Sequence, residues 1–157
     1  FRFPSKVKKL AYYSLIRLKL EYACTVWDPY TKKNIVALEA IQRKAVRFMF
    51  SKYRTSDSPS ILMNENSIPQ LQIQRKIQRL KYLFLLKNNK LAMSPEPYLT
   101  PLTTRPTRHH HAQCVTPYQA KINAFKYSFF PHTVEEWNKL PSDVTMSIES
   151  IDKLLAF

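Results

Sequence analysis

The sequence predicts an all-α fold: a small helical bundle with a Pro-rich linker and a short aromatic-rich carboxy-terminal segment. Before residue 90, apolar residues recur every three or four positions, which is the spacing of one face of an amphipathic helix. Further along, prolines interrupt this spacing, because proline lacks the amide donor that a helix needs. With 157 residues, of which 45% are hydrophobic, the chain is long and apolar enough to bury an ordinary core.

Three long helices are expected in the first part of the chain. Ser5 and Thr31 are candidate N-caps for the first two, because a hydroxyl can accept a hydrogen bond from the free amides of a first helical turn. Ser67 and Gln70 have the spacing of a capping box and mark the start of the third. The expected helices cover residues 6–22, 32–52 and 70–88, with a short helical piece at residues 59–64.

The sequence divides the chain into three regions. Residues 1–90 form a basic helical region, and residues 91–118 form a Pro/Thr-rich linker in extended conformation. Residues 119–157 form an aromatic carboxy-terminal subdomain. This subdomain is too short to bury its own rings, so we expect it to pack on the first region.

The elements of the last region are expected to be short. Its aromatic residues alternate as in a strand, namely Phe125, Tyr127, Phe129 and Phe130. Thr133 and Glu136 have capping-box spacing, which predicts a helix over residues 134–140. Ser147 is a candidate cap for a last helix over residues 148–156.

The charge balance predicts a polyanionic partner. The chain has 25 Lys and Arg residues against 11 Asp and Glu residues, so its net charge is +14. Nucleic acid is the first candidate for that partner, and an ordinary basic surface is the alternative. Glycine is absent. Its absence excludes P-loops and dinucleotide-binding fingerprints, since both need glycine where the backbone approaches phosphate.

Two of the expected helices have basic outer faces. The first helix has its apolar positions at Val7, Leu10, Ala11, Leu15 and Leu18. The second has an apolar side of Leu38, Ile41, Ala45, Phe48 and Met49, and a basic side of Lys33, Arg43, Lys44 and Arg47. The third places Ile73, Ile77, Leu80 and Phe84 together, with Arg75 and Arg79 facing away. These six basic residues are the predicted nucleic-acid-binding residues, and ordinary solvated faces are the alternative.

No arrangement of side chains predicts catalysis or a metal site. The aspartates are scattered, whereas polymerase or nuclease chemistry needs clustered carboxylates that hold two divalent ions. The run from His109 through His110 to His111, near Cys114, lacks the spacing of a zinc knuckle, and contact of these imidazoles with a partner or a phosphate stays open. We therefore expect a chain that is no enzyme on its own and needs no cofactor.

The setting is expected to be intracellular. The chain has two cysteines, Cys24 and Cys114, and no apolar run long enough to span a membrane, so no membrane partner is predicted. It starts at Phe1 without a recognisable signal segment, so we expect a fragment of a longer protein.

Trp27, Trp137 and the ring cluster of residues 125–130 are suited to stacking on bases, but core packing is the favoured interpretation.

Two segments carry a family resemblance. They are LEYACTVWDPYTKKNIVALEAIQRKAVRF, from Leu20 to Phe48, and NAFKYSFFPHTVEEWNKLP, from Asn123 to Pro141. Both resemble the region that follows the catalytic palm in reverse transcriptases of jockey-type non-LTR (LINE-like) retrotransposons. The stretch from Arg54 to Asn88 is similar to the helical part between them in that family. The chain departs from the family at Leu18, where proline is common, and at residues 66–69, which replace a segment that often contains Gly and Trp.

The resemblance implies a role in holding nucleic acid. It identifies residues 1–90 as thumb-like, and thumb helices of that family brace the template-primer duplex, whether RNA, DNA or hybrid. It carries the basic residues Arg43, Lys44 and Arg47 over to that role. The parent would be an RNA-directed DNA polymerase that uses Mg, with palm and endonuclease domains upstream as partners, in the nucleus and cytoplasm. The alternative is a helical protein-interaction module left from a decayed retroelement.

Overall fold

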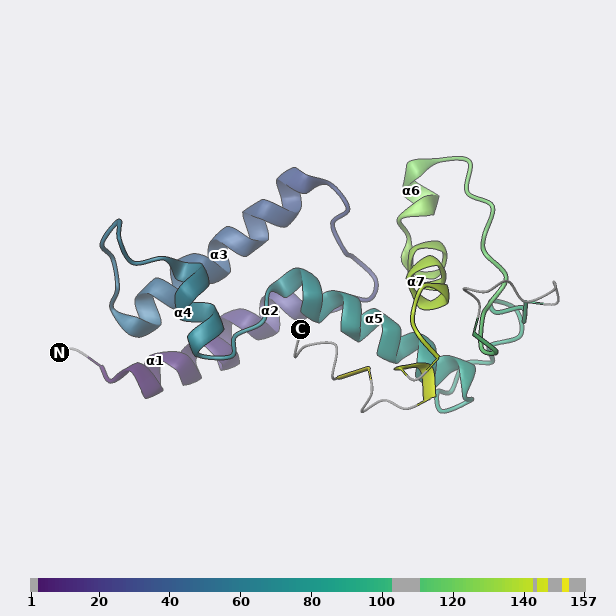
Figure 1. Cartoon of the computed structure of the whole chain (residues 1–157), viewed down its shortest axis with the longest axis horizontal. Helices are drawn as coiled ribbons and strands as arrows, with labels where there is room; N and C mark the ends of the chain where they lie inside the picture. The colour runs from purple at the N-terminus through teal and green to yellow at the C-terminus, as the bar shows by residue number, and fades with distance from the viewer. Residues whose placement is uncertain (1–2, 103–110, 143, 147–150, 153–157) are drawn as a thin grey trace. The chain divides into compact units, whose positions relative to one another are not determined.

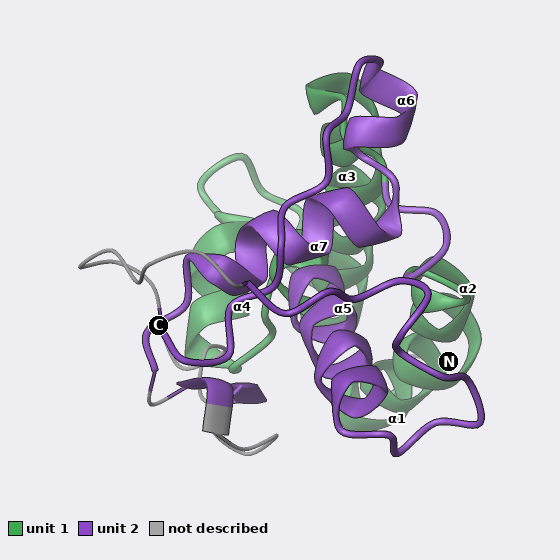
Figure 2. Ribbon diagram, turned by 90° about the vertical axis from the view of Figure 1, so that its right-hand side faces the viewer, with its two compact units in different colours: residues 1–24, 29–74 green, residues 25–28, 75–157 purple. Residues whose placement is uncertain are grey.

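The computed structural model describes residues 3–102, 111–142, 144–146 and 151–152, and they are mostly helical (Figure 1). The all-α prediction is confirmed: the described part of the chain contains no β-strand, only an isolated antiparallel bridge between Pro101 and Val115. Two compact units divide it (Figure 2). Unit 1 comprises residues 1–24 and 29–74, and unit 2 comprises residues 25–28 and 75–157.

The first helix of unit 1 is continuous but not uniform. It consists of α1 (Ser5–Ala11), the π-helical turn η1 (Tyr12–Arg17) and α2 (Leu18–Glu21), close to the predicted 6–22. Ser5 is the first helical residue and not the N-cap, which is Pro4, and no side-chain hydrogen bond caps the helix. The predicted cap is therefore wrong by one position, although the helix is present.

The second helix, α3 (Lys32–Phe50), agrees closely with the predicted 32–52. Thr31 occupies the N-cap position with extended backbone, but its side chain makes no capping hydrogen bond. Ser51 ends the helix in the left-handed conformation, with φ 54°. The short helix expected at residues 59–64 is also present, as α4 (Pro59–Glu65).

The predicted capping box at Ser67 and Gln70 is wrong. Ser67 has a left-handed φ of 52°, and the amide of the next residue, Ile68, donates to the carbonyl of Met63 at 2.9 Å. Ser67 thus closes the turn that follows α4. The third long helix, α5 (Leu71–Lys87), agrees with the predicted 70–88. It begins in unit 1 and continues into unit 2.

The core of unit 1 differs from the predicted apolar faces. It consists of Tyr12, Ala45, Val46, Met49, Met63 and Ile68. Val7, Leu10, Leu15 and Leu18 of the first helix are exposed, as are Ile41 and Phe48 of α3. Two polar side chains of α3 are buried in their place, and both have specific partners. Gln42 Nε2 donates to the carbonyl of Pro69 at 3.0 Å, and Glu39 Oε1 accepts from the amide of Gln72 at 3.0 Å.

Unit 2 is built on the part of α5 that follows Gln74. Its other elements are α6 (Asn123–Lys126), α7 (Phe129–Asn138) and the 3-10 turn η2 (Val144–Met146). The strand predicted from alternating aromatics is wrong, because those residues lie in and between two helices. The helix predicted at 134–140 begins earlier, with Ser128 at the N-cap position, so that Thr133 lies inside it and is buried.

Part of the predicted carboxy-terminal helix falls outside the described residues. Ile151 and Asp152 are helical, but Ser147 and most of residues 148–156 cannot be compared with the structure. Ile151 is buried in the core of unit 2, and the Asp152 carboxylate forms an ion pair with Lys81. The described part of this segment is therefore anchored on α5.

The core of unit 2 includes residues that the sequence assigned to a linker. It contains Ile77, Leu80, Leu83, Phe84, Leu86, Leu99, Val115, Val134, Trp137, Leu140 and Ile151. Leu99 and Val115 belong to the predicted linker of residues 91–118, and Cys114 beside them is also buried. The described linker residues thus pack on α5 and α7. The division between the units falls between Gln74 and Arg75 of α5, whereas the sequence predicted a boundary near residue 90.

Candidate nucleic-acid interface

The positive charge is unevenly divided between the two units. Unit 1 carries 13 Lys and Arg residues against four Asp and Glu residues, and unit 2 carries 12 against seven. Three of the four acids of unit 1 are engaged. Arg17 pairs with Glu21 at 2.7 Å, Glu39 accepts from a backbone amide, and Asp57 accepts from the amide of Arg54 at 3.1 Å. Little negative charge therefore faces solvent on unit 1.

The basic face of α3 lies where the sequence predicted it. Lys33, Arg43 and Lys44 are exposed. At about 3.6 residues per turn, Lys33 and Lys44 are close to three whole turns apart, and Arg43 lies about a quarter turn to one side of them, so all three fall within an arc of about 100° on α3. Among the residues that the structure describes, no carboxylate forms an ion pair with any of the three. Their charges are thus available to an anion.

Arg47 completes this face with a different environment. Its side chain is partly buried, and its Nε atom is buried without a hydrogen-bond partner in the described part of the chain. Packing of the Arg47 stem restricts the side chain. Arg43 and Arg47 are one turn apart, so their guanidinium groups are spaced to contact neighbouring phosphates of one strand.

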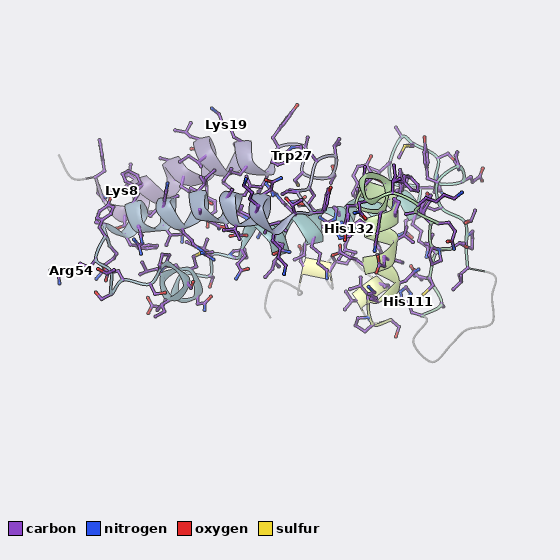
Figure 3. All side chains as sticks on the ribbon, turned by 90° about the horizontal axis from the view of Figure 1, so that it is seen from above. Lys8, Lys19, Trp27, Arg54, His111 and His132 are labelled. Atoms are coloured by element: carbon purple, nitrogen blue, oxygen red, sulfur yellow. The ribbon has the colours of Figure 1, made fainter. Side chains whose placement is uncertain are left out.

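Sequence reasoning missed basic residues at the end of α3. Lys8 is buried, donates from Nζ to Ser51 Oγ at 2.7 Å, and lies 5.0 Å from the centre of the Phe48 ring. Lys52 and Arg54 follow α3 and line an open hollow of about 930 Å³. Figure 3 shows Lys8 and Arg54 near the C-terminal end of α3. For Lys52 and Arg54 the available signal was their position at the end of a helix already predicted to be basic, whereas Lys8 comes from a different helix and had no such signal.

The prediction that Arg75 and Arg79 bind nucleic acid is wrong in its premise that they face solvent. Both are buried, with exposed fractions of 2% and 3%. The guanidinium of Arg79 lies between two carboxylates: it donates to Glu136 Oε2 at 2.7 Å and pairs with Asp28. Arg75 lies 3.8 Å from Asp28 and 4.8 Å from the centre of the Trp27 ring. Carboxylates of distant segments neutralise these two arginines.

The two segments that carry the family resemblance meet in unit 2. Trp27 and Asp28 come from the first segment, and Glu136 comes from the second; all three contact the arginines of α5. Glu136 is thus an ion-pair partner, and its predicted capping role is wrong. Beside it, Asn138 Oδ1 accepts from the amide of Val115 at 2.9 Å and Asn138 Nδ2 donates to its carbonyl at 2.7 Å.

Trp137 has a structural role. It is fully buried, and its indole donates to the carbonyl of Gln113 at 3.0 Å. The favoured interpretation of this ring as core is confirmed. Trp27 is half-exposed beside Arg75.

The histidines have separate environments. His132 Nε2 lies 3.7 Å from Glu136 Oε1. Burial, together with the nearby Arg79 charge, lowers the pKa of His132, and Glu136 opposes this effect. His111 Nε2 lies 3.1 Å from the Trp137 carbonyl, while His109 and His110 lie outside the described residues.

Both cysteines are buried and form no disulfide, Cys24 in unit 1 and Cys114 in unit 2. The described residues contain no group of three side chains arranged to hold a metal ion. Nor does this part of the chain contain a helix that is long and apolar enough to cross a membrane. Comparison of the chain with models of known protein families, with curated proteins and with solved structures gave no match.

Proposed function

We propose that this chain is a nucleic-acid-binding accessory part of an RNA-directed DNA polymerase, with unit 1 acting as a thumb-like clamp on a duplex. The observation that carries the proposal is the basic face of α3, formed by the exposed Lys33, Arg43 and Lys44 and the partly buried Arg47. A rigid helix of 19 residues presents these charges. Because no described carboxylate neutralises the first three, phosphates are their natural counter-ions.

Such a clamp reads the backbone of the duplex. Phosphates are the same for every base pair, so binding is expected to be independent of sequence and suited to RNA, DNA or hybrid duplexes. This suits a polymerase, which must hold every sequence that it copies. In the proposal, catalysis and Mg belong to the palm of the parent protein, and this chain supplies binding without a cofactor of its own.

The test is the salt dependence of binding. Labelled DNA, RNA and hybrid duplexes of unrelated sequence would be titrated with the full chain at several salt concentrations, with fluorescence anisotropy as the readout. We expect similar affinities across sequences and a straight line of log affinity against log salt, with a slope near −0.9 for each phosphate contact on DNA. An affinity that does not change with salt would overturn the proposal.

A second candidate function rests on the exposed apolar side chains of the first helix. Val7, Leu10, Leu15 and Leu18 are exposed at helical spacing, and exposed apolar patches often mark protein-protein contacts. They favour a helical protein-interaction module. Apolar docking responds weakly to salt, so the same titration separates the two functions.

A further inference from the structure

Four aromatic rings of unit 2 form a contiguous series. Phe125 and Tyr118 pack edge to face with ring centres 6.0 Å apart, and Tyr118 and Phe130 are 6.3 Å apart. Phe130 then stacks on Tyr98 with parallel rings whose centres are 4.9 Å apart. We call these four residues the aromatic platform.

The two central rings of the platform pack against the core of unit 2, and the two rings at its ends are partly exposed. Phe130 and Tyr118 pack against the core of unit 2, and the Tyr118 hydroxyl donates to the carbonyl of Tyr98. Ser128 Oγ donates to the carbonyl of Phe125 at 2.7 Å, which holds the turn between α6 and α7. Tyr98 and Phe125 nevertheless remain 40% and 42% exposed. Rings held in place at this exposure lose little conformational freedom when a flat ligand stacks on them.

Positive charge lies beside the platform. Lys121 and Lys126 are exposed within and just before α6, the helix that carries Phe125. In the described part of the chain, neither lysine forms an ion pair. Lys126 Nζ lies 5.7 Å from the centre of the Tyr127 ring. Glu96, two residues before Tyr98, is the acid nearest in sequence to a platform ring.

We propose that the aromatic platform binds unpaired nucleotides, with bases stacking on Phe125 and Tyr98 and with Lys121 and Lys126 contacting the adjacent phosphates. Single-stranded nucleic acid is commonly held by exposed aromatic rings next to positive charge. A duplex covers the faces of its bases by stacking them on one another, so it cannot use such rings. The proposal rests on the proposed function in that the chain binds nucleic acid, but it assigns unpaired strands to unit 2 and duplexes to unit 1.

The first test replaces an exposed ring in the full chain. The probe is a labelled thymidine oligomer of about 12 nucleotides, a length within the usual site sizes. Phe125→Ala is expected to weaken its binding by about tenfold, the effect of one lost stacking contact, while the slope against salt stays the same. Phe125→Trp keeps a ring and should retain the affinity. Tyr53→Ala removes an aromatic residue of unit 1 that is 62% exposed, and serves as the matched control.

A second test leaves the protein unchanged. An oligomer of the same length with abasic sites keeps the phosphates and lacks the bases, so it loses the stacking on both Phe125 and Tyr98, and the parent chain should bind it more than about tenfold more weakly than the thymidine oligomer. Phe125→Ala keeps only Tyr98 for stacking, so the difference in affinity between the two oligomers should be about tenfold smaller for this variant than for the parent chain. If the parent chain binds both equally, or if Tyr53→Ala weakens binding as much as Phe125→Ala, the proposal is overturned. If a proline-rich peptide displaces the thymidine oligomer, and the abasic oligomer binds as tightly as the thymidine oligomer, the platform binds peptides and the proposal is overturned.

The lysines give a third measurement. Lys121→Gln combined with Lys126→Gln should flatten the plot of log affinity against log salt for the oligomer by about 1.4, since each contact with a single strand contributes about 0.7. An unchanged slope would contradict their role. Phe125→Ala should leave duplex binding intact, whereas loss of the α3 charges should weaken it. Failure of the platform and failure of the clamp therefore give different results.

Discussion

Each unit contains a pair of arginines one helical turn apart, and the two pairs differ completely in environment. Arg43 and Arg47 of unit 1 lie on the basic side of α3, with Arg43 exposed and unpaired with any described carboxylate. Arg75 and Arg79 of unit 2 are buried against acidic partners. The same local pattern thus serves phosphate binding in our proposal for one unit and folding in the other. Partners distant in sequence decide which.

The largest expected effect comes from removing the buried ion pairs of Arg79. Arg79→Gln leaves the carboxylates of Asp28 and Glu136 without their shared cation, so the free energy of unfolding of unit 2 should fall by about 3 kcal/mol. Trp27 and Trp137 both belong to unit 2, so tryptophan fluorescence during urea unfolding reports on that unit.

The matched control for this change is Arg43→Gln. It makes the same substitution on an exposed position of α3 and should change stability by less than about 0.5 kcal/mol. Equal effects of the two substitutions would contradict the comparison between the arginine pairs. Loss of stability only in Arg79→Gln would support it.

The next effect concerns the side chain that joins α7 to the segment near Val115. Asn138→Ala removes two hydrogen bonds to the Val115 backbone and leaves its amide and carbonyl without their partner, so unit 2 should lose about 2 kcal/mol. Asn88→Ala is the control, because Asn88 is exposed and its side chain bonds only locally, to the Phe84 carbonyl at 2.7 Å. Similar destabilisation by both, measured by the same urea unfolding, would show that Asn138 has no special role.

A third change tests the exposed side of the comparison. Arg43→Gln combined with Lys44→Gln should flatten the plot of log duplex affinity against log salt by about 1.8, which corresponds to two phosphate contacts. Helix content measured by circular dichroism should stay the same, because glutamine is a comparable helix former. The control pair, Lys19→Gln with Lys90→Gln, removes two other exposed charges. If the control flattens the slope equally, binding is spread over the surface and α3 has no special role.

These contrasts explain which features could be predicted from the sequence. The bounds of α3 and α5 follow from apolar spacing, which is a local property, and both predictions agree with the structure within two residues. The buried faces depend on other segments. Nothing near Arg79 in sequence indicates that Asp28 and Glu136 neutralise it. A helical-wheel projection of α5 therefore placed the Arg79 side chain toward solvent. The described linker residues were misread similarly, because prolines exclude long helices but do not prevent Leu99 and Val115 from packing in a core.

The same limit applies to the helix ends and to the candidate site. The Thr133 and Glu136 spacing fits a capping box, yet α7 starts at Phe129, and Glu136 contacts Arg79. Short capping patterns recur by chance, and tertiary contacts decide between them. The basic side of α3 was predictable because it needs no partner within the chain. The aromatic platform was not, since Tyr98 and Phe130 come from separate predicted regions.

The smallest expected effect is a pH dependence of unit 2 that arises from His132. Its folded-state pKa is lowered by burial and by the Arg79 charge, so the unfolded chain binds the proton more readily than the folded chain. Stability from neutral His132 is therefore present above the ordinary histidine pKa, near 6.5, and is lost as the pH falls below it.

The measurement compares urea unfolding of the parent chain and of His132→Gln at about pH 7.5 and about pH 5.5, on either side of the ordinary histidine pKa. Glutamine cannot take up a proton, so the variant should lose less stability between the two conditions than the parent chain. Glu136 opposes the shift by attracting the protonated ring across 3.7 Å, which keeps the effect small. Glu136→Gln removes this carboxylate, so the part of the pH dependence of stability that arises from His132 should become larger in that variant. An identical pH dependence with and without His132 would contradict the prediction, because it would show that protonation of His132 does not contribute to the stability of unit 2.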